Sequence, residues 1–562
     1  MKRLFFILCL TVFAVCGCLK ETPKSSTTAE KYYRTAAQIK TGVNGCYLPL
    51  RSILSTRGFW LMTEANTDII FMSSNTMYDA NCDVSPARPS VGATIWQNGY
   101  KGVMYTNEII TDINFAIENG YVTADEVKGY IAEAVVLRAM YYYLLTSTFG
   151  DVPFYTDKVT EQNRAAIACL PRMDARATRA FCINDIKEWI LDNRSLPFVR
   201  TYSNDSEGRA GAAVGLMVAA KMALWNEQWE DAVTFVGELE NIYGAGCYAD
   251  DPAKFGEDYP LTDIPFSVKF AKESIFELEN KSEDYGTQVT SLLAAYTTPT
   301  RKALPTDTES TKEDDEEEEG TSLYVENYDG ILIPELGAYS RISSGARPTA
   351  YVYKQLLPYY SNDLRNGEYS NGKNEARGGS GALAWRWKGY SAADDAGKTE
   401  EKVMFFSTCN SASKRPWLGN KFWCYGMYDQ RDANNYKIFR FADALLMKAE
   451  ALLNLGRTEE ACRYLNVTRT RAGLEAVTFA GVGSSSVSLM EEIRKERAKE
   501  LFGEFQRKFD LVRWGIWYER TKTYNESASL QNYIRPYHRY WPIPADQVSY
   551  SGGALDNNEY KQ

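Results

Sequence analysis

Two distant stretches of the sequence repeat one pattern, and this repeat limits the fold more than any other feature. AAKMALWNEQWEDAV, residues 219–233, aligns without a gap on KAEALLNLGRTEEAC, residues 448–462. In each copy a helical pattern with small residues on one face leads into a short turn, and acidic residues open a second helical pattern, where they favour the helix dipole. Unless two unrelated hairpins are alike by chance, the sequence contains two helix–turn–helix units, near residues 212–240 and 440–472.

The second copy has the clearer turn, with Gly456 as the expected helix terminator and Thr458 as the expected N-cap. Small residues let the paired helices of such units pack closely, as in tetratricopeptide repeats, which these units resemble. Because repeat units pack only on their neighbours, 562 residues need not divide into separate domains. We therefore expect residues 31–562 to form a single, mainly α domain.

The first eighteen residues, MKRLFFILCLTVFAVCGC, have the features of a bacterial lipoprotein signal. Two basic residues precede an apolar run, which is shorter than the ~20 residues of a membrane-spanning helix. The small residue Gly17 stands before Cys18, as in a lipobox, whereas a bulky valine stands before Cys16. We expect residues 1–17 to be removed and Cys18 to be lipidated, with ordinary signal cleavage as the alternative. The polar residues 18–30 are expected to act as a flexible tether.

Charge and histidine content exclude several classes of function. The formal net charge is −10, whereas nucleic-acid binding needs clustered Lys and Arg, so no nucleic-acid partner is expected. The single histidine, His538, argues against zinc sites built on His pairs and against Ser-His-Asp triads. We expect His538 to be structural or solvent-facing, and we predict no metal and no cofactor.

Eight cysteines follow the lipidation site, and they are scattered without a CxxC motif. An oxidising compartment permits disulfides, but the spacing does not reveal which pairs form. These cysteines are Cys46, Cys82, Cys169, Cys182, Cys247, Cys409, Cys424 and Cys462.

Residues 250–430 differ from the helical parts of the chain. Gly, Ser, Asn and aromatic residues increase there and helical periodicity fades, which indicates a loop-rich insertion. Seven consecutive acids, Glu313 to Glu319, repel one another and favour a solvated loop. A calcium site is the alternative, but the run has neither a glycine at mid-loop nor alternating ligands.

Aromatic residues in loops are the candidates for a ligand-binding site. WRWKGY, residues 385–390, and RPWLGNKFWCYGMY, residues 415–428, set large rings among glycines and polar residues, whereas Trp96 occurs at helical spacing with Tyr100 and is expected in the core. Flat rings can cover the CH face of a sugar while polar neighbours bond its hydroxyls. The alternative is that the loop rings fill a core. The candidate ligand-binding residues are Trp60, Trp385, Trp387, Tyr390, Trp417, Trp423 and Tyr425.

A densely charged helix is expected around residues 492–509. Four glutamates spaced four apart form one line on it, and Lys or Arg follows three of them at three positions. Arg497 falls on a separate apolar line and should be buried beside an acid. Paired carboxylates also suggest a glycoside hydrolase, but residues on one helical face approach a substrate from one side only. The glutamates are Glu492, Glu496, Glu500 and Glu504, and the basic residues are Lys495, Lys499 and Arg507.

Several motifs, taken in order, resemble those of the SusD/RagB family of outer-membrane nutrient-binding lipoproteins. Residues 439–474 look like the family's signature helical hairpin, residues 493–515 like its next helix, and YWPIPADQV, residues 540–548, like its Pro-Ile-Pro segment. In the N-terminal half, W..GY......N at residues 96–107 and LRAMYYYLLTSTFGDVPFY at residues 137–155 match as well. The resemblance covers nearly the whole chain, apart from the central insertion.

This resemblance implies a superhelix of four tetratricopeptide-like units with an irregular, loop-rich, ligand-facing region. Such proteins lie on the cell surface, anchored to the outer membrane through a lipidated cysteine, here Cys18, as a lid over a SusC-like TonB-dependent transporter. They capture oligosaccharides, or peptides in some members, and have no known catalytic residues. We therefore expect a non-enzymatic glycan-binding protein, with a peptide-binding protein of the RagB type and a glycoside hydrolase as alternatives.

Overall fold

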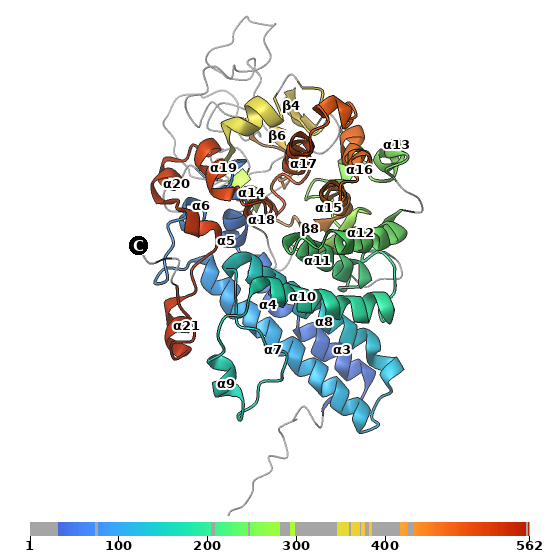
Figure 1. Cartoon of the computed structure of the whole chain (residues 1–562), viewed down its shortest axis with the longest axis vertical. Helices are drawn as coiled ribbons and strands as arrows, with labels where there is room; N and C mark the ends of the chain where they lie inside the picture. The colour runs from blue at the N-terminus through green and yellow to red at the C-terminus, as the bar shows by residue number, and fades with distance from the viewer. Residues whose placement is uncertain are drawn as a thin grey trace, which may run out of the picture.

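The computed structural model describes residues 32–72, 77–203, 208–244, 248–281, 291, 293–297, 345–358, 361–370, 373–376, 381–384, 416–424, 431–557 and 560. In these residues the two longest helices, 91–118 and 124–149, lie towards one end of the molecule, and the small strands of residues 367–384 lie towards the other (Figure 1). No helix in this described part combines the length and the apolar character needed to cross a bilayer.

The helices fall into a long and a short group. The longer helices are α3 (Ala36–Gly45), α7 (Val91–Glu118), α8 (Ala124–Phe149), α10 (Ala175–Ile186), α11 (Ala212–Trp225), α12 (Trp229–Tyr243), α15 (Phe441–Asn454), α16 (Thr458–Arg471) and α17 (Ser486–Glu500). The shorter helices are α4 (Leu48–Leu54), α5 (Arg57–Trp60), α6 (Tyr78–Asn81), α9 (Arg164–Ala168), α13 (Pro252–Asp258), α14 (Leu293–Thr297), α18 (Arg507–Arg513), α19 (Trp517–Tyr524), α20 (Ala528–Tyr533) and α21 (Ala545–Tyr550).

Helices α7 and α8 form the first long antiparallel pair (Figure 1). A capping box starts α8: the Thr123 hydroxyl accepts from the Glu126 N–H, and the Glu126 carboxylate accepts from the Thr123 N–H. From Ile131 to Phe149 every residue of α8 is buried. Trp96 of α7 is buried as well and contacts Tyr100, with ring centroids 4.9 Å apart, so the prediction that Trp96 belongs to the core is confirmed.

The two copies of the repeat form the helical hairpins α11–α12 and α15–α16, as the sequence predicts. Gly456 ends the first helix of the second hairpin with a φ of +75°, a conformation that favours glycine. Thr458 is the first residue of α16 and Arg457 holds the N-cap position, so the expected N-cap is wrong by one residue. Helix α12 packs on α15, and the Lys221 ammonium lies 2.5 Å from the Asp443 carboxylate between α11 and α15. The two units therefore stack on each other.

The charged helix is shorter than the sequence predicts. Helix α17 ends at Glu500, and the chain turns before α18 begins at Arg507. Gly503 and Phe505 have φ values of +75° and +64°, which a continuous helix does not allow. The expected line of four glutamates is thus interrupted before Glu504.

Four small antiparallel sheets accompany the helices. They pair β1 (Ile70–Met72) with β3 (Ala346–Pro348), β2 (Ser274–Leu278) with β8 (Tyr436–Arg440), β4 (Gly367–Ser370) with β5 (Lys373–Ala376), and β6 (Leu383–Ala384) with β7 (Trp417–Leu418). Strand β8 leads directly into α15. The loop-rich part of the chain is thereby attached to the second helical hairpin.

The lone histidine is structural, and the described cysteines form no disulfides. His538 is buried, its Nδ1 accepts from the Arg535 N–H at 3.1 Å, and burial lowers its pKa to about 3. This bears out its expected structural role. The described cysteines all carry free thiols, and Cys247 and Cys409 lie outside the described residues.

Candidate functional site

Two of the predicted ligand-binding tryptophans are core residues. Trp60 is 2 % exposed and its indole N–H donates to the Gly503 carbonyl at 3.0 Å. Trp423 is 0 % exposed and its indole N–H donates to the Leu418 carbonyl at 2.8 Å. Neither ring has a face that a ligand can cover, so the prediction of a binding role is wrong for both. Loop composition alone does not distinguish a ring that fills a core from one that is presented to a ligand.

The remaining candidates belong to two segments that start from one sheet. Trp385, Trp387, Tyr390 and Tyr425 lie outside the described residues. Trp417 lies on β7, and its backbone pairs with Ala384 of β6, the residue directly before Trp385. The two aromatic segments, more than twenty residues apart in sequence, are therefore joined where they leave the scaffold.

A glycine allows this close pairing of β6 and β7. A Cβ added at Gly419 would lie 2.2 Å from the Gly381 carbonyl oxygen and 2.8 Å from the Leu383 carbonyl oxygen. Such distances are far below van der Waals contact, so only glycine fits at this position without a backbone shift. The Gly419 N–H in turn donates to the Ala382 carbonyl at 2.9 Å.

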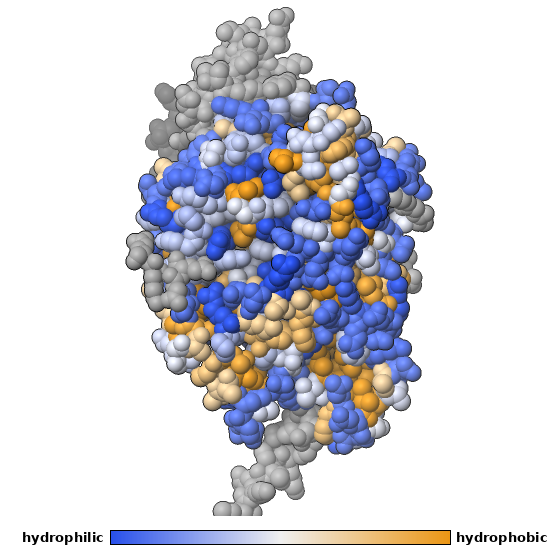
Figure 2. Space-filling model, viewed as in Figure 1, coloured by the Kyte–Doolittle hydropathy of each residue, from blue (hydrophilic) through white to orange (hydrophobic). Residues whose placement is uncertain are grey.

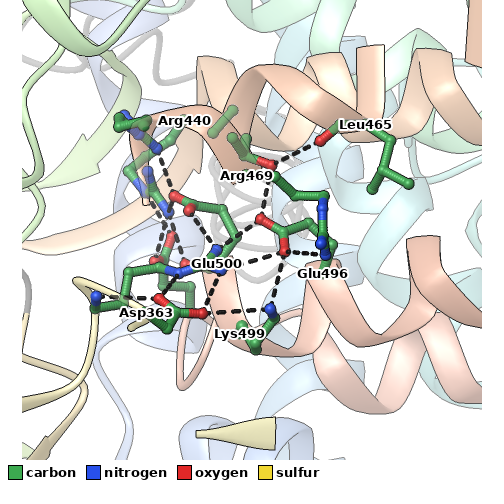
Figure 3. Close-up of polar contacts among 12 residues, drawn as sticks. Asp363, Arg440, Leu465, Arg469, Glu496, Lys499 and Glu500 are labelled. Carbon is green, nitrogen blue, oxygen red and sulfur yellow. Dashed lines mark hydrogen bonds and ion pairs between the residues drawn. The ribbon is translucent and has the colours of Figure 1, made fainter. Parts of the chain in front are cut away.

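Beneath this sheet, a buried ion-pair network connects the loop-rich segment to α17. The Arg365 guanidinium lies 2.8 Å from Asp363, 2.7 Å from Glu496 and 3.0 Å from Glu500, whose carboxylates it binds. Figure 3 shows Asp363, Glu496 and Glu500 gathered together. Lys421, shortly after β7, lies 2.6 Å from Glu504. All six side chains are buried. The network therefore joins both sides of the β6–β7 sheet to the charged helix and the turn after it.

The same network reaches the second helical hairpin. Arg440, at the end of β8, donates to Glu273 at 2.8 Å and to Glu500 at 3.1 Å, and Arg471 of α16 donates to the same two carboxylates at 2.8 and 2.6 Å. Arg440 also binds Glu504 at 2.8 Å. Glu500 is thus shared by three guanidinium groups, those of Arg365, Arg440 and Arg471.

These guanidinium groups fix the charge of the buried acids. Burial alone would raise the pKa of Glu500, but Arg471, Arg440 and Arg365 outweigh it and lower that pKa well below its usual range. Arg365 likewise outweighs burial at Asp363 and lowers its pKa to about 2. Carboxylates that stay ionised and have no access to solvent cannot serve as a glycosidase general acid, which needs a raised pKa. The network is structural: it holds the loop-rich part of the chain to α17 and to the turn after it.

Of the ion pairs that the sequence predicts for the charged helix, only some are present. Lys495 and Lys499 do pair with Glu492 and Glu496, at 2.8 and 3.3 Å. Arg507 does not pair with Glu504, because the chain turns between them, and it binds Asp68 at 2.6 Å instead.

The predicted burial of Arg497 is confirmed. Its guanidinium lies 2.8 Å from Asp510 and 2.9 Å from Asp443. Sequence spacing gave no sign of Asp363, Arg365 or Lys421, because their partners on α17 and in the turn after it lie far away along the chain.

The sequence matches the family described as "SusD family" over residues 272–560 and the one described as "Starch-binding associating with outer membrane" over residues 20–207. SusD-like proteins P25 and P2 of Formosa agariphila are each 24 % identical, P25 over 98 % of both chains and P2 over 91 % of this chain and 90 % of its own.

Solved structures show the same fold. Surface glycan-binding protein A from Bacteroides thetaiotaomicron, in complex with laminarihexaose, aligns with a TM-score of 0.64 at 20 % identity over 93 % of this chain and 99 % of its own. The protein of the same name from Bacteroides uniformis gives a TM-score of 0.64 at 20 % identity, over 94 % of this chain and all of its own. The predicted mainly α, tetratricopeptide-like fold is therefore confirmed.

Proposed function

The chain belongs to the SusD family, and on this premise we propose that it binds oligosaccharides at the cell surface without hydrolysing them. The observation that carries the proposal is the β6–β7 sheet, which pairs Ala384 with Trp417 and so joins the two aromatic segments that the sequence marks as ligand-binding. Rings of Trp385, Trp387, Tyr390, Trp417 and Tyr425 would cover the CH faces of sugar units.

The buried network supports a binding role in a physical way. Interactions that hold a site in place before the ligand arrives reduce the entropy lost on binding. Here the ion pairs of Arg365 and Lys421 fix the base of the sheet to α17 and to the turn after it. The aromatic segments therefore extend from a rigid support.

We further propose that the protein is anchored to the outer membrane through lipidated Cys18 and passes its ligand to a SusC-like TonB-dependent transporter. The lipobox around Cys18 and the family description that mentions the outer membrane support this location. Residues 18–30, the proposed tether, would leave the folded body free to dock on a transporter.

The test is direct binding by the purified full chain carrying Cys18→Ala, which keeps it off membranes. Retention of neutral oligosaccharides on a glycan array, followed by calorimetry, is the expected result. The triple change Trp385→Ala, Trp387→Ala, Trp417→Ala should weaken binding at least tenfold, on the scale of lost aromatic contacts. Phe115→Ala with Phe181→Ala, two exposed rings on helices, is the control and should leave affinity unchanged.

Other outcomes select the alternatives. Retention of peptides and of no glycan would replace the oligosaccharide by a peptide, as in the RagB type. Release of shorter products from a bound glycan, lost on substitution of a single Glu or Asp, would make the protein a glycoside hydrolase. Unchanged affinity in the triple variant would leave glycan binding intact but remove the site from the two aromatic segments.

A further inference from the structure

A separate cleft of about 360 Å³ lies away from the β6–β7 sheet, between α7, the loop after α8, α9 and α21. Trp96, Gln97 and Tyr100 of α7 form one wall, and Gln547 and Tyr550 of α21 form another. Figure 2 shows hydrophobic residues gathered over this lower part of the molecule, around α9 and α10. The cleft is thus built from the two ends of the described chain.

The aromatic wall of the cleft is rigid. The rings of Tyr100 and Tyr155 are nearly parallel, with centroids 6.4 Å apart and an interplanar angle of 8°. The Tyr100 hydroxyl donates to the Pro153 carbonyl at 2.8 Å, and the Tyr155 backbone is held on both sides by the Tyr142 hydroxyl, at 2.8 and 3.0 Å. These bonds fix the two half-buried rings before any ligand binds.

Helix α21 is fixed against this wall although it is short. The Trp541 N–H donates to the Thr148 carbonyl at 2.8 Å, and the Ala545 N–H donates to the Pro86 carbonyl at 2.9 Å. Tyr550 stands at the end of α21 with 73 % of its surface exposed. It therefore faces the cleft with a large ring that solvent, or a ligand, can reach.

The chemistry of the cleft is aromatic, amide and uncharged. None of the side chains that line it is an acid or a base, since its polar members are the carboxamides of Gln97 and Gln547 and the phenols. Burial raises the pKa of Tyr155 to about 12, so its hydroxyl stays neutral. Among the described residues, the Gln97 carboxamide and the hydroxyls of Tyr155 and Tyr550 have no hydrogen-bond partner. They are available to a ligand.

A second cleft differs from this one because charged side chains line it. The groove of about 460 Å³ beside α3 and α8 is lined by Lys40, Lys128, Arg209, Asp125 and Glu133, among others. Charges of both signs there would bind ions or charged chains, and they would have to lose their water to bind a neutral sugar. The uncharged cleft has no such cost, and it offers the flat rings and neutral hydrogen-bonding groups that a sugar unit requires.

We propose that the cleft between α7 and α21 is a second contact site for neutral oligosaccharides, in which sugar units stack on Tyr155 and Tyr550 and bond to Gln97. The inference rests on the proposed glycan-binding function and adds to it a site outside the aromatic loops. Its occupant is uncharged, because an acidic glycan or a charged peptide would find no counter-charge on the walls.

The test starts from the triple loop variant Trp385→Ala, Trp387→Ala, Trp417→Ala of the full chain, so that the cleft is measured alone. Calorimetry with laminarihexaose and maltohexaose, and with an oligogalacturonate as the acidic probe, should detect residual binding of a neutral probe only. Adding Tyr155→Ala and Tyr550→Ala should weaken that binding roughly tenfold or more. Tyr155→Phe, which keeps the ring, should weaken it less.

The control is Tyr533→Ala, which removes a ring 46 % exposed on α20 and should change nothing. If the triple loop variant binds the neutral probes equally with and without the rings of Tyr155 and Tyr550, or does not bind them at all, while the unmodified chain binds glycan, the cleft is overturned and the proposed function stands. Preference for the oligogalacturonate would overturn it too. Failure of the unmodified chain to bind any glycan would overturn both proposals together.

Discussion

The charged guanidinium of Arg497 is buried away from water. Burial opposes that charge, but Asp510 and Asp443 outweigh it and raise the pKa of Arg497. The sequence predicts the burial because Arg497 falls on the apolar line of its helix, and it predicts an acidic partner because an unpaired buried charge is too costly. Which acids supply the partner was not predictable, since Asp443 lies on α15 and reaches Arg497 only in the folded chain.

Arg497→Ala should lower the free energy of unfolding by about 3–5 kcal/mol, because it takes one guanidinium partner away from two buried carboxylates, those of Asp510 and Asp443. Urea unfolding followed by circular dichroism measures this change. Lys495→Ala on the same helix removes an exposed pair with Glu492 and should cost less than about 1 kcal/mol. Similar costs for the two variants would contradict the assignment.

At the scale of elements, helical periodicity predicted the two hairpins well and the charged helix only in part. The hairpins follow from local patterns: apolar spacing, the glycine turn at Gly456 and acidic first turns. The break between α17 and α18 depends on two residues with a left-handed backbone conformation, Gly503 and Phe505. A glycine in the sequence is a signal for this conformation, whereas a phenylalanine is not. The burial of Glu500 was not predictable, because its guanidinium partners lie 29, 60 and 135 residues away.

Gly503→Ala tests this break. The residue combines a φ of +75° with a position where a Cβ would lie 2.5 Å from the Phe422 ring, whereas Gly456 has the same φ and open space around it. Gly456→Ala should therefore cost only the backbone strain, about 1–2 kcal/mol. Gly503→Ala should cost clearly more, measured by urea unfolding of both variants. Equal costs would show that the turn moves away from Phe422 without penalty.

At the scale of the whole molecule, the fold was predictable and the site was predictable only as a region. Residue types marked the loop-rich part and its tryptophans, but Trp60 and Trp423 proved to be buried, each with its indole N–H bonded to a backbone carbonyl. Trp96 was correctly assigned to packing, whereas its neighbour Tyr100 is only half-buried and forms part of one wall of the uncharged cleft. No spacing rule joins α7 to α21, which lie at opposite ends of the chain.

Anchoring is also a property of the whole molecule. Cys18→Ala should move the protein from the outer-membrane fraction to the soluble fraction, because the acyl chains that would hold it at the bilayer need this thiol. Immunoblotting of fractionated cells measures the shift. Cys16→Ala, two residues earlier in the sequence, should leave the protein at the membrane, and release by Cys16→Ala instead would assign the lipid to that residue.

The ion-pair network below the β6–β7 sheet has a consequence for how such a protein changes over evolutionary time. Arg365 and Lys421 tie the base of the sheet to α17 and its following turn, through ion pairs that use no side chain between Ala384 and Trp417. We expect substitutions in that stretch to change which nutrient is bound without removing these ion pairs, so that related proteins can inherit one fold and differ in what they take up.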